Sequence, residues 1–148
     1  MKSRHLAREI ALQILYEYDV GSFPTGVELD GAIHKHFEHF KVPEKLRDFA
    51  GELVRGTVQH REALDQTLEK HATHWKLSRM SVIDRNLLRM ALYEMQNFKD
   101  IPASVSIDEA IELAKQFGSS ESPSFINGIL DAYHRENSAP GSSSKESE

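Results

Sequence analysis

Apolar residues recur every three or four positions along most of the chain, a spacing typical of the buried face of an α-helix. The pattern predicts helices over residues 4–18, 27–40, 43–68 and 81–95, and two more within 101–133. No run alternates apolar and polar residues as a half-buried strand does, and no Asn-Gly turn joins two β-branched runs. The sequence therefore predicts an all-α fold.

The third predicted helix contains an interruption. Gly56 and the polar run 59–61 break its apolar stripe, which Leu64 and Leu68 then continue in the same period. The pattern leaves open whether this segment is one bent helix or two. We interpret it as the division between two helical bundles.

Two packed helical subdomains follow from this division, an N-terminal three-helix bundle over residues 1–59 and a C-terminal helical bundle over residues 60–136. In the second, Ser81 is a predicted N-cap, and Asp84 stands three residues later as in a capping box. The helix that they begin has apolar residues on several faces, so we expect it at the centre of its bundle. The polar tail 137–148 is predicted to be disordered.

The last two predicted helices are joined by a short polar turn. Pro102 suits a first helical position, Gly118 stands where a left-handed residue often ends a helix, and Ser122 with the proline after it can begin the next one. Phe125 lies just beyond the turn. An aromatic ring beside unpaired backbone N–H groups can seat a base and its phosphate, whereas the alternative is that Phe125 closes the core at the helix end.

The composition is that of a globular protein and excludes several kinds of chemistry. Of 148 residues, 39% are hydrophobic and 28% are charged, and the absence of cysteine excludes disulfides, thiol catalysis and thiolate zinc sites. No apolar run approaches the roughly 18 residues of a membrane helix. A chain without cysteine fits a reducing compartment, so we expect a cytoplasmic protein with no membrane association.

Motifs for catalysis and metal binding are missing. There is no GxxxxGKS/T, GxSxG or GxGxxG motif, so the sequence predicts neither an enzyme nor a bound cofactor. His34, His36 and His39 cluster, and His71 and His74 lie three apart, a spacing at which two imidazoles can share a metal ion. Because no HExxH pattern and no third ligand accompany them, we interpret them as a solvated polar face and predict no metal site.

Three segments carry a resemblance to a known family. They read SRHLAREIALQILYEYD near the N-terminus, DRNLLRMALYEM at positions 84–95, and SVSIDEAIELAKQFGSSESPSFINGILD in the last third. In this order they resemble the NusB family of bacterial transcription antitermination factors, over residues 3–133. The resemblance implies an all-helical fold of two packed subdomains, in agreement with the periodicity.

Basic residues gather at the start of the first helix. Lys2, Arg4 and Arg8 precede the first acid, Glu9, with His5 among them, and Arg4 and Arg8 share one helix face. The pattern alone also allows an ordinary solvated face that pairs with Glu9. The resemblance implies that these residues bind the boxA RNA element. His5 stands where the richest versions of the motif have arginine, so the basic patch is thinner here.

The polar turn supplies a second set of candidate RNA-binding residues. By resemblance, Glu121 matches an acidic position close to the RNA, Phe125 matches an aromatic position, and Ser124 stands where a basic residue can occur. If the first helix packs beside the last, Arg4, Arg8 and Phe125 would form a single solvent-facing surface. Such a surface would offer phosphate contacts and base stacking to a flexible strand.

Tyr16 and Asp84 are the candidate protein-binding residues. The pattern alone explains Asp84 as a cap partner and Tyr16 as an aromatic residue at the core edge. The resemblance places the matching positions on the surface that binds NusE, a small-subunit ribosomal protein. An aromatic anchor beside a carboxylate suits a basic partner.

The predicted function is therefore antitermination. By resemblance, the chain binds boxA RNA jointly with NusE in the RNA polymerase antitermination complex and promotes read-through, notably in ribosomal RNA operons. The alternatives are an RNA-binding module related to the N-terminal part of rRNA methyltransferases and a protein-only helical scaffold. A homodimer that hides the RNA surface is a further expectation to test.

Overall fold

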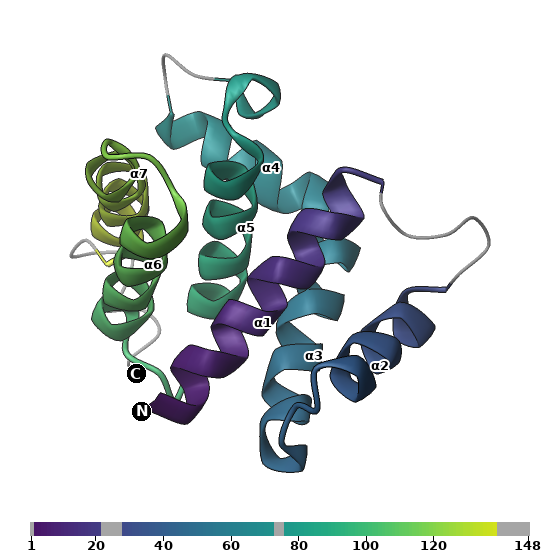
Figure 1. Cartoon of the computed structure of the whole chain (residues 1–148). Coiled ribbons are helices and arrows are strands. Elements are labelled where there is room, and N and C mark those ends of the chain that lie inside the picture. Colours follow the sequence, from purple (N-terminus) through teal and green to yellow (C-terminus); the bar gives the residue numbers. More distant parts are fainter. Residues whose placement is uncertain (1, 22–27, 73–75, 139–148) are drawn as a thin grey trace.

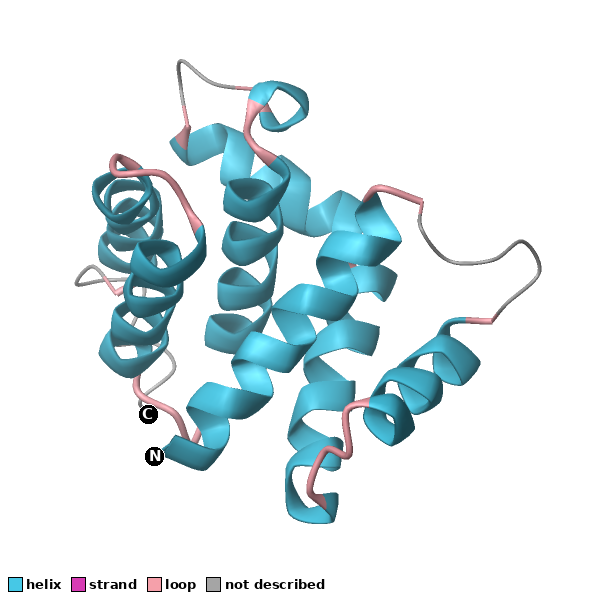
Figure 2. Ribbon diagram, viewed as in Figure 1, coloured by secondary structure: helices cyan, strands magenta, loops and turns pink. Residues whose placement is uncertain are grey.

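The computed structural model describes residues 2–21, 28–72 and 76–138, which form seven α-helices and one short 3-10 helix (Figure 1). The elements are α1 (Lys2–Asp19), α2 (Leu29–His39), α3 (Glu44–Gln59), α4 (Arg61–His71), η1 (Leu77–Arg79), α5 (Val82–Asn97), α6 (Ala103–Phe117) and α7 (Ser122–Asn137). Figure 2 shows no strand in these ranges, so the prediction of an all-α fold is confirmed. None of the described helices combines the length and apolar character needed to span a bilayer.

Helix α5 lies at the centre of the molecule. Every residue from Asn86 to Glu94 is buried. The helix packs against α1 and α3 on one side, against α6 and α7 on the other, and also against α4 (Figure 1). This central position confirms the expectation from its apolar residues on several faces.

The interruption after α3 separates two helices. His60 ends α3 and also precedes the first residue of α4, so the segment is not one bent helix. Buried residues of both helices, Leu53 and Val54 in α3 and Leu64 and Leu68 in α4, belong to one apolar cluster that continues into α5, α6 and α7. The core is thus continuous across residue 59, and the division into two subdomains stays a prediction.

Two glycines have roles that differ from the expected ones. Gly56 lies inside α3, and a Cβ there would be 1.9 Å from Cζ of Tyr93, so the glycine lets α3 and α5 approach closely. Gly118 is not left-handed, because its φ is −97°. A Cβ at Gly118 would lie 2.5 Å from Oγ of Ser122, so the tight turn between α6 and α7 leaves no room for a side chain at this position.

The predicted helix starts are correct to within one or two residues. Ser81 caps α5, and its Oγ accepts the backbone N–H of Asp84 at 3.1 Å. Pro102 is the N-cap of α6 and not its first residue. Ser122 is the first residue of α7, and its Oγ accepts the backbone N–H of Ser119 at 3.0 Å, so it closes the turn. Of the tail predicted over residues 137–148, Asn137 still belongs to α7, and the part beyond residue 138 lies outside the described residues.

Candidate nucleic-acid interface

Among the described side chains at the start of α1, Arg4 is the arginine that faces solvent. Its side chain is 46% exposed, and its Nη2 lies 3.6 Å from Oδ2 of Asp100. It stands at a hollow of about 520 Å³ between α1 and the start of α6, called here the arginine hollow, which is lined by Arg4, Arg8, Asp100, Ile101, Pro102, Val105 and Glu109. A guanidinium at this position can bind a phosphate oxygen. Lys2 begins α1, but its side chain lies outside the described part.

Arg8 does not share that exposed position. Its side chain is 4% exposed, and its Nε and Nη2 donate to the two carboxylate oxygens of Glu94 at 2.9 and 2.6 Å. Nη1 lies 3.5 Å from Oε1 of Glu109. The expectation of a solvated Arg4–Arg8 face is therefore wrong, and Glu9 is not the partner of Arg8. Because the inner face of α1 covers the buried Glu94, that carboxylate needs a cation beside it.

The ion pair of Arg8 belongs to a larger network that joins three helices. His5 of α1 makes a hydrogen bond through Nδ1 to Oε1 of Glu109 on α6 at 2.7 Å. Ser106, also on α6, donates its hydroxyl to Oε2 of Glu94 at 2.7 Å. This set, called the Arg8 network, fixes the start of α1 against α5 and α6. Its arginine is satisfied within the protein, so its direct role is to hold the surface on which Arg4 stands.

Phe125 lies at the other end of α6. The ring is partly buried and packs against the core, and the backbone N–H donates to the carbonyl of Glu121 at 3.1 Å. Helix α6 has 15 residues and is therefore about 22 Å long. Arg4 lies beside Asp100, just before the start of α6, whereas Phe125 follows the end of α6. Arg4 and Phe125 therefore lie at opposite ends of α6, and the predicted side-by-side placement of Arg4, Arg8 and Phe125 is wrong. Glu121 and Ser124 are exposed beside the turn.

Asp84 joins the residues of this turn. A hollow of about 140 Å³, called the turn hollow, is lined by Arg79, Met80, Ser81, Asp84, Ser119, Glu121, Ser122 and Phe125. Oδ1 of Asp84 is buried and has no hydrogen-bond partner within the described part of the chain. The structure thus brings a predicted protein-binding residue together with Glu121 and Phe125, which were predicted to bind RNA.

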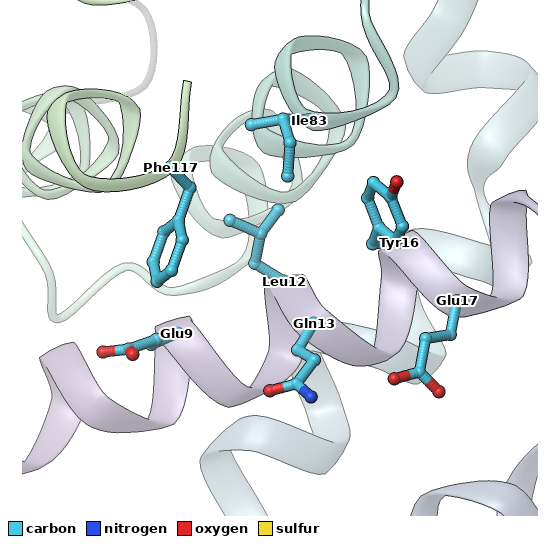
Figure 3. A pocket seen from close by; sticks show the side chains of 7 residues that line it. All are labelled: Glu9, Leu12, Gln13, Tyr16, Glu17, Ile83 and Phe117. Atoms are coloured by element: carbon cyan, nitrogen blue, oxygen red, sulfur yellow. The ribbon is translucent and has the colours of Figure 1, made fainter. Parts of the chain in front are cut away.

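Tyr16 lines a third hollow, which runs along α1. This α1 groove has a volume of about 350 Å³ and is lined by Glu9, Leu12, Gln13, Tyr16, Glu17, Ile83 and Phe117. Figure 3 shows the side chains of Leu12, Ile83 and Phe117 converging above α1, with Tyr16 beside them. Tyr16 is 39% exposed and Phe117 is 42% exposed. Phe117, the last residue of α6, thus belongs to the groove and not to the buried core.

A second ionic cluster, not identified from the sequence, holds the C-terminal end of α1. The carboxylate of Asp19 is 5% exposed, and it accepts hydrogen bonds from Nε of Arg85 at 2.7 Å and from Nδ2 of Asn86 at 2.8 Å. Nη1 of Arg89 lies at 3.3 Å. Burial alone would raise the pKa of Asp19, but the hydrogen bonds from Arg85 and Asn86 and the charges of Arg85 and Arg89 outweigh it and lower the pKa to about 2.

Two of the histidines that the sequence singled out pair with acidic residues. His36 places Nε2 2.8 Å from Oε1 of Glu17, and His71 places Nε2 3.0 Å from Oε1 of Glu136. His74 lies outside the described residues. Among the described residues, no three potential metal ligands converge.

Comparison with known proteins gives consistent matches over most of the chain. A sequence model of the NusB family matches residues 5–135. The chain is 52% identical over 129 residues to the transcription antitermination protein NusB of Desulfitobacterium hafniense, covering 87% of this chain and 86% of that relative. Among solved structures, NusB of T. maritima aligns with a TM-score of 0.82 at 31% identity, covering 95% of this chain and 96% of the other. A structure of the antitermination factors NusB and NusE in complex with dsRNA aligns with a TM-score of 0.79 at 25% identity, covering 92% and 98% respectively.

Proposed function

The chain belongs to the NusB family, and from this premise we propose that it is a transcription antitermination factor that binds boxA RNA together with the ribosomal protein NusE. The protein acts by assembly and not by catalysis. It joins RNA and protein partner to RNA polymerase in the cytoplasm and promotes read-through, notably in ribosomal RNA operons. Two modest interfaces on one chain raise the effective concentration of each partner for the other, so both bind more tightly together than alone.

The observation that carries the RNA-binding role is the half-exposed guanidinium of Arg4 at the arginine hollow. In this proposal the phosphate contacts come from Lys2, Arg4 and His5. Arg8 holds the start of α1 in place through the Arg8 network. Phosphate contacts of this kind position a strand, whereas contacts to bases give sequence preference.

Phe125, Glu121 and Ser124 form the far end of the same RNA path. A strand that reaches from Arg4 to this turn must follow α6 for about 22 Å. A strand that keeps a stacked spacing of about 3.4 Å per nucleotide would place about six to seven nucleotides along that path.

The protein partner binds the α1 groove and Asp84, which also lines the turn hollow at the far end of the RNA path. Tyr16, Phe117 and Ile83 supply an apolar floor, and Glu9 and Glu17 add carboxylates at the edge. An exposed aromatic pair with an acidic rim is complementary to a basic protein that inserts an apolar side chain. The net charge of −5 on the whole chain favours the same partner.

The proposal is tested by measuring RNA affinity over a series of salt concentrations, with and without NusE. Arg4→Ala is expected to weaken RNA binding and to reduce the slope of log K against log salt by about 0.7, the value for one phosphate contact on a single strand. NusE binding should stay unchanged. Arg55→Ala is the matched control, because Arg55 is also partly exposed, at 41%, and also pairs with an exposed aspartate, Asp30.

The same measurement separates the alternatives. A wild-type chain that binds NusE but shows no salt-dependent RNA affinity is a protein-only scaffold, and the proposal fails. If NusE binding falls as far as RNA binding when Arg4 is replaced, the assignment of Arg4 to the RNA alone fails.

A further inference from the structure

An aromatic ring from α3 lies against the basic start of α1. The ring centroid of Phe49 is 4.9 Å from Cζ of Arg4 and 5.3 Å from Cζ of Arg8. Both distances fall within the range of cation–π attraction, which extends to about 6 Å. One ring therefore attracts two guanidinium groups that the sequence places four residues apart.

The ring of Phe49 is itself held in place. It is partly buried, packs against the core, and meets Phe98 edge-on with centroids 5.2 Å apart. Phe98 in turn meets Tyr93 edge-on at 6.3 Å, and the hydroxyl of Tyr93 donates to Glu52 on α3. This row of rings runs from the central helix to the surface at Arg4, so the ring has little freedom to move away.

The two guanidinium groups on the ring differ in what else they can bind. Arg8 is buried and forms ion pairs with the carboxylates of Glu94 and Glu109. Arg4 is half exposed, with Asp100 at 3.6 Å. A guanidinium attracted to the face of a ring keeps its N–H donors in its own plane, where they can reach phosphate oxygens. Arg4 is thus the group through which the ring can affect a ligand.

We propose that Phe49 is the positioning residue of the RNA site, because its ring holds the guanidinium of Arg4 ready to bind a phosphate. An arginine loses much side-chain freedom when it binds, and one that already rests on a ring has lost part of it beforehand. This inference rests on the proposed function. It adds a residue of α3 to a site otherwise formed by α1 and the segment around α6.

The test is a double-mutant cycle on the full chain with NusE present and boxA RNA as the ligand. Phe49→Leu removes the ring and is expected to weaken RNA binding about threefold to fivefold. In the background of Arg4→Ala the same change should have no effect, because its target is gone. Phe49→Tyr keeps the ring and should restore the affinity of the wild type. If Phe49→Leu fails to fold, Phe49→Met replaces it in the cycle.

Phe37→Leu serves as the matched control. The ring of Phe37, on α2, lies 5.6 Å from Cζ of Arg47, so this variant also loses a cation–π contact, but away from the arginine hollow. It should leave RNA affinity unchanged. If Phe49→Leu lowers RNA affinity equally with and without Arg4, or does not lower it at all, the positioning role of Phe49 is wrong. The proposed function still stands in that case, provided that the wild type binds RNA. A wild type that binds no RNA overturns both.

Discussion

Arg8 and Glu94 form a bidentate ion pair in the protein interior, with nitrogen–oxygen distances of 2.9 and 2.6 Å, although 86 positions separate them in the sequence. Both side chains are almost fully buried. The pair joins the start of α1 to the end of the central helix. Its energetic effect depends on both partners being present, because either charge alone would be left buried without a counter-charge.

Replacing Arg8 should therefore destabilise the fold. Arg8→Ala is expected to lower the free energy of unfolding by about 3–5 kcal/mol, since Glu94 then remains buried and unpaired. Urea denaturation measures the loss. Arg135→Ala, which breaks an exposed pair with Asp131, should cost less than about 0.5 kcal/mol. The double variant Arg8→Met/Glu94→Leu should be more stable than Arg8→Ala, and equal losses for the buried and the exposed pair would contradict the argument.

Removing the charge of Asp100 should strengthen RNA binding. Asp100 lies 3.6 Å from Arg4 and competes with a phosphate for its guanidinium. Asp100→Asn is expected to tighten RNA binding about twofold, in line with the small energies of exposed pairs. Asp30→Asn is the matched control, because Asp30 is as exposed and pairs with Arg55. Weaker binding by Asp100→Asn would show that this carboxylate helps to hold Arg4 in place.

The ionic cluster at Asp19 should make stability depend on pH in acid. The pKa of Asp19 is about 2 in the folded state against an ordinary value of 3.8, so its carboxylate contributes stability above about pH 4. That contribution, about 2 kcal/mol, is lost as the pH falls toward 2. Denaturation of the wild type and of Asp19→Asn at several pH values measures it. The two curves should converge at low pH, and a constant separation down to pH 2 would contradict the assignment.

Adding a methyl group at Gly56 should disrupt the packing of α3 on α5. The new Cβ of Gly56→Ala would lie 1.9 Å from Cζ of Tyr93. The clash is relieved only if the ring of Tyr93 moves, although its hydroxyl is held by a hydrogen bond to Glu52. A loss of about 1–3 kcal/mol or more is expected from overpacking. Gly31→Ala is the opposite case, because nothing lies within 4 Å of the added Cβ in α2. That variant should gain up to about 1 kcal/mol from helix propensity. Thermal denaturation compares the two, and a stabilised Gly56→Ala would show that the helices can separate.

The helices and much of the core could be predicted from the sequence because helical periodicity is a local property. The stripe of α1 and the apolar faces of α5 lie within single segments, and burial follows from them. Helix ends were less certain, since the hydroxyl of Ser122 can cap a helix or close a turn with equal chemistry. Only the position of Ser119 decides between the two.

The candidate site was harder to predict because it depends on which helices cover which faces. Arg4 and Arg8 share one side of α1, but Glu94 lies on a helix 86 positions away, so the sequence did not reveal that Arg8 is buried. In the same way, Phe49 lies outside the three segments that carry the family resemblance, so the resemblance did not point to it. Its contact with Arg4 arises from the packing of α3 beside α1.

The long separation within the Arg8–Glu94 pair also bears on how the chain is made. A ribosome adds about 5–20 residues per second, so Arg8 is synthesised about 4–17 s before Glu94. During that interval the inner face of α1, with Ile14 and Leu15, has no central helix to cover it. Until translation reaches α5, α1 can pack only on segments that are already made, such as α3.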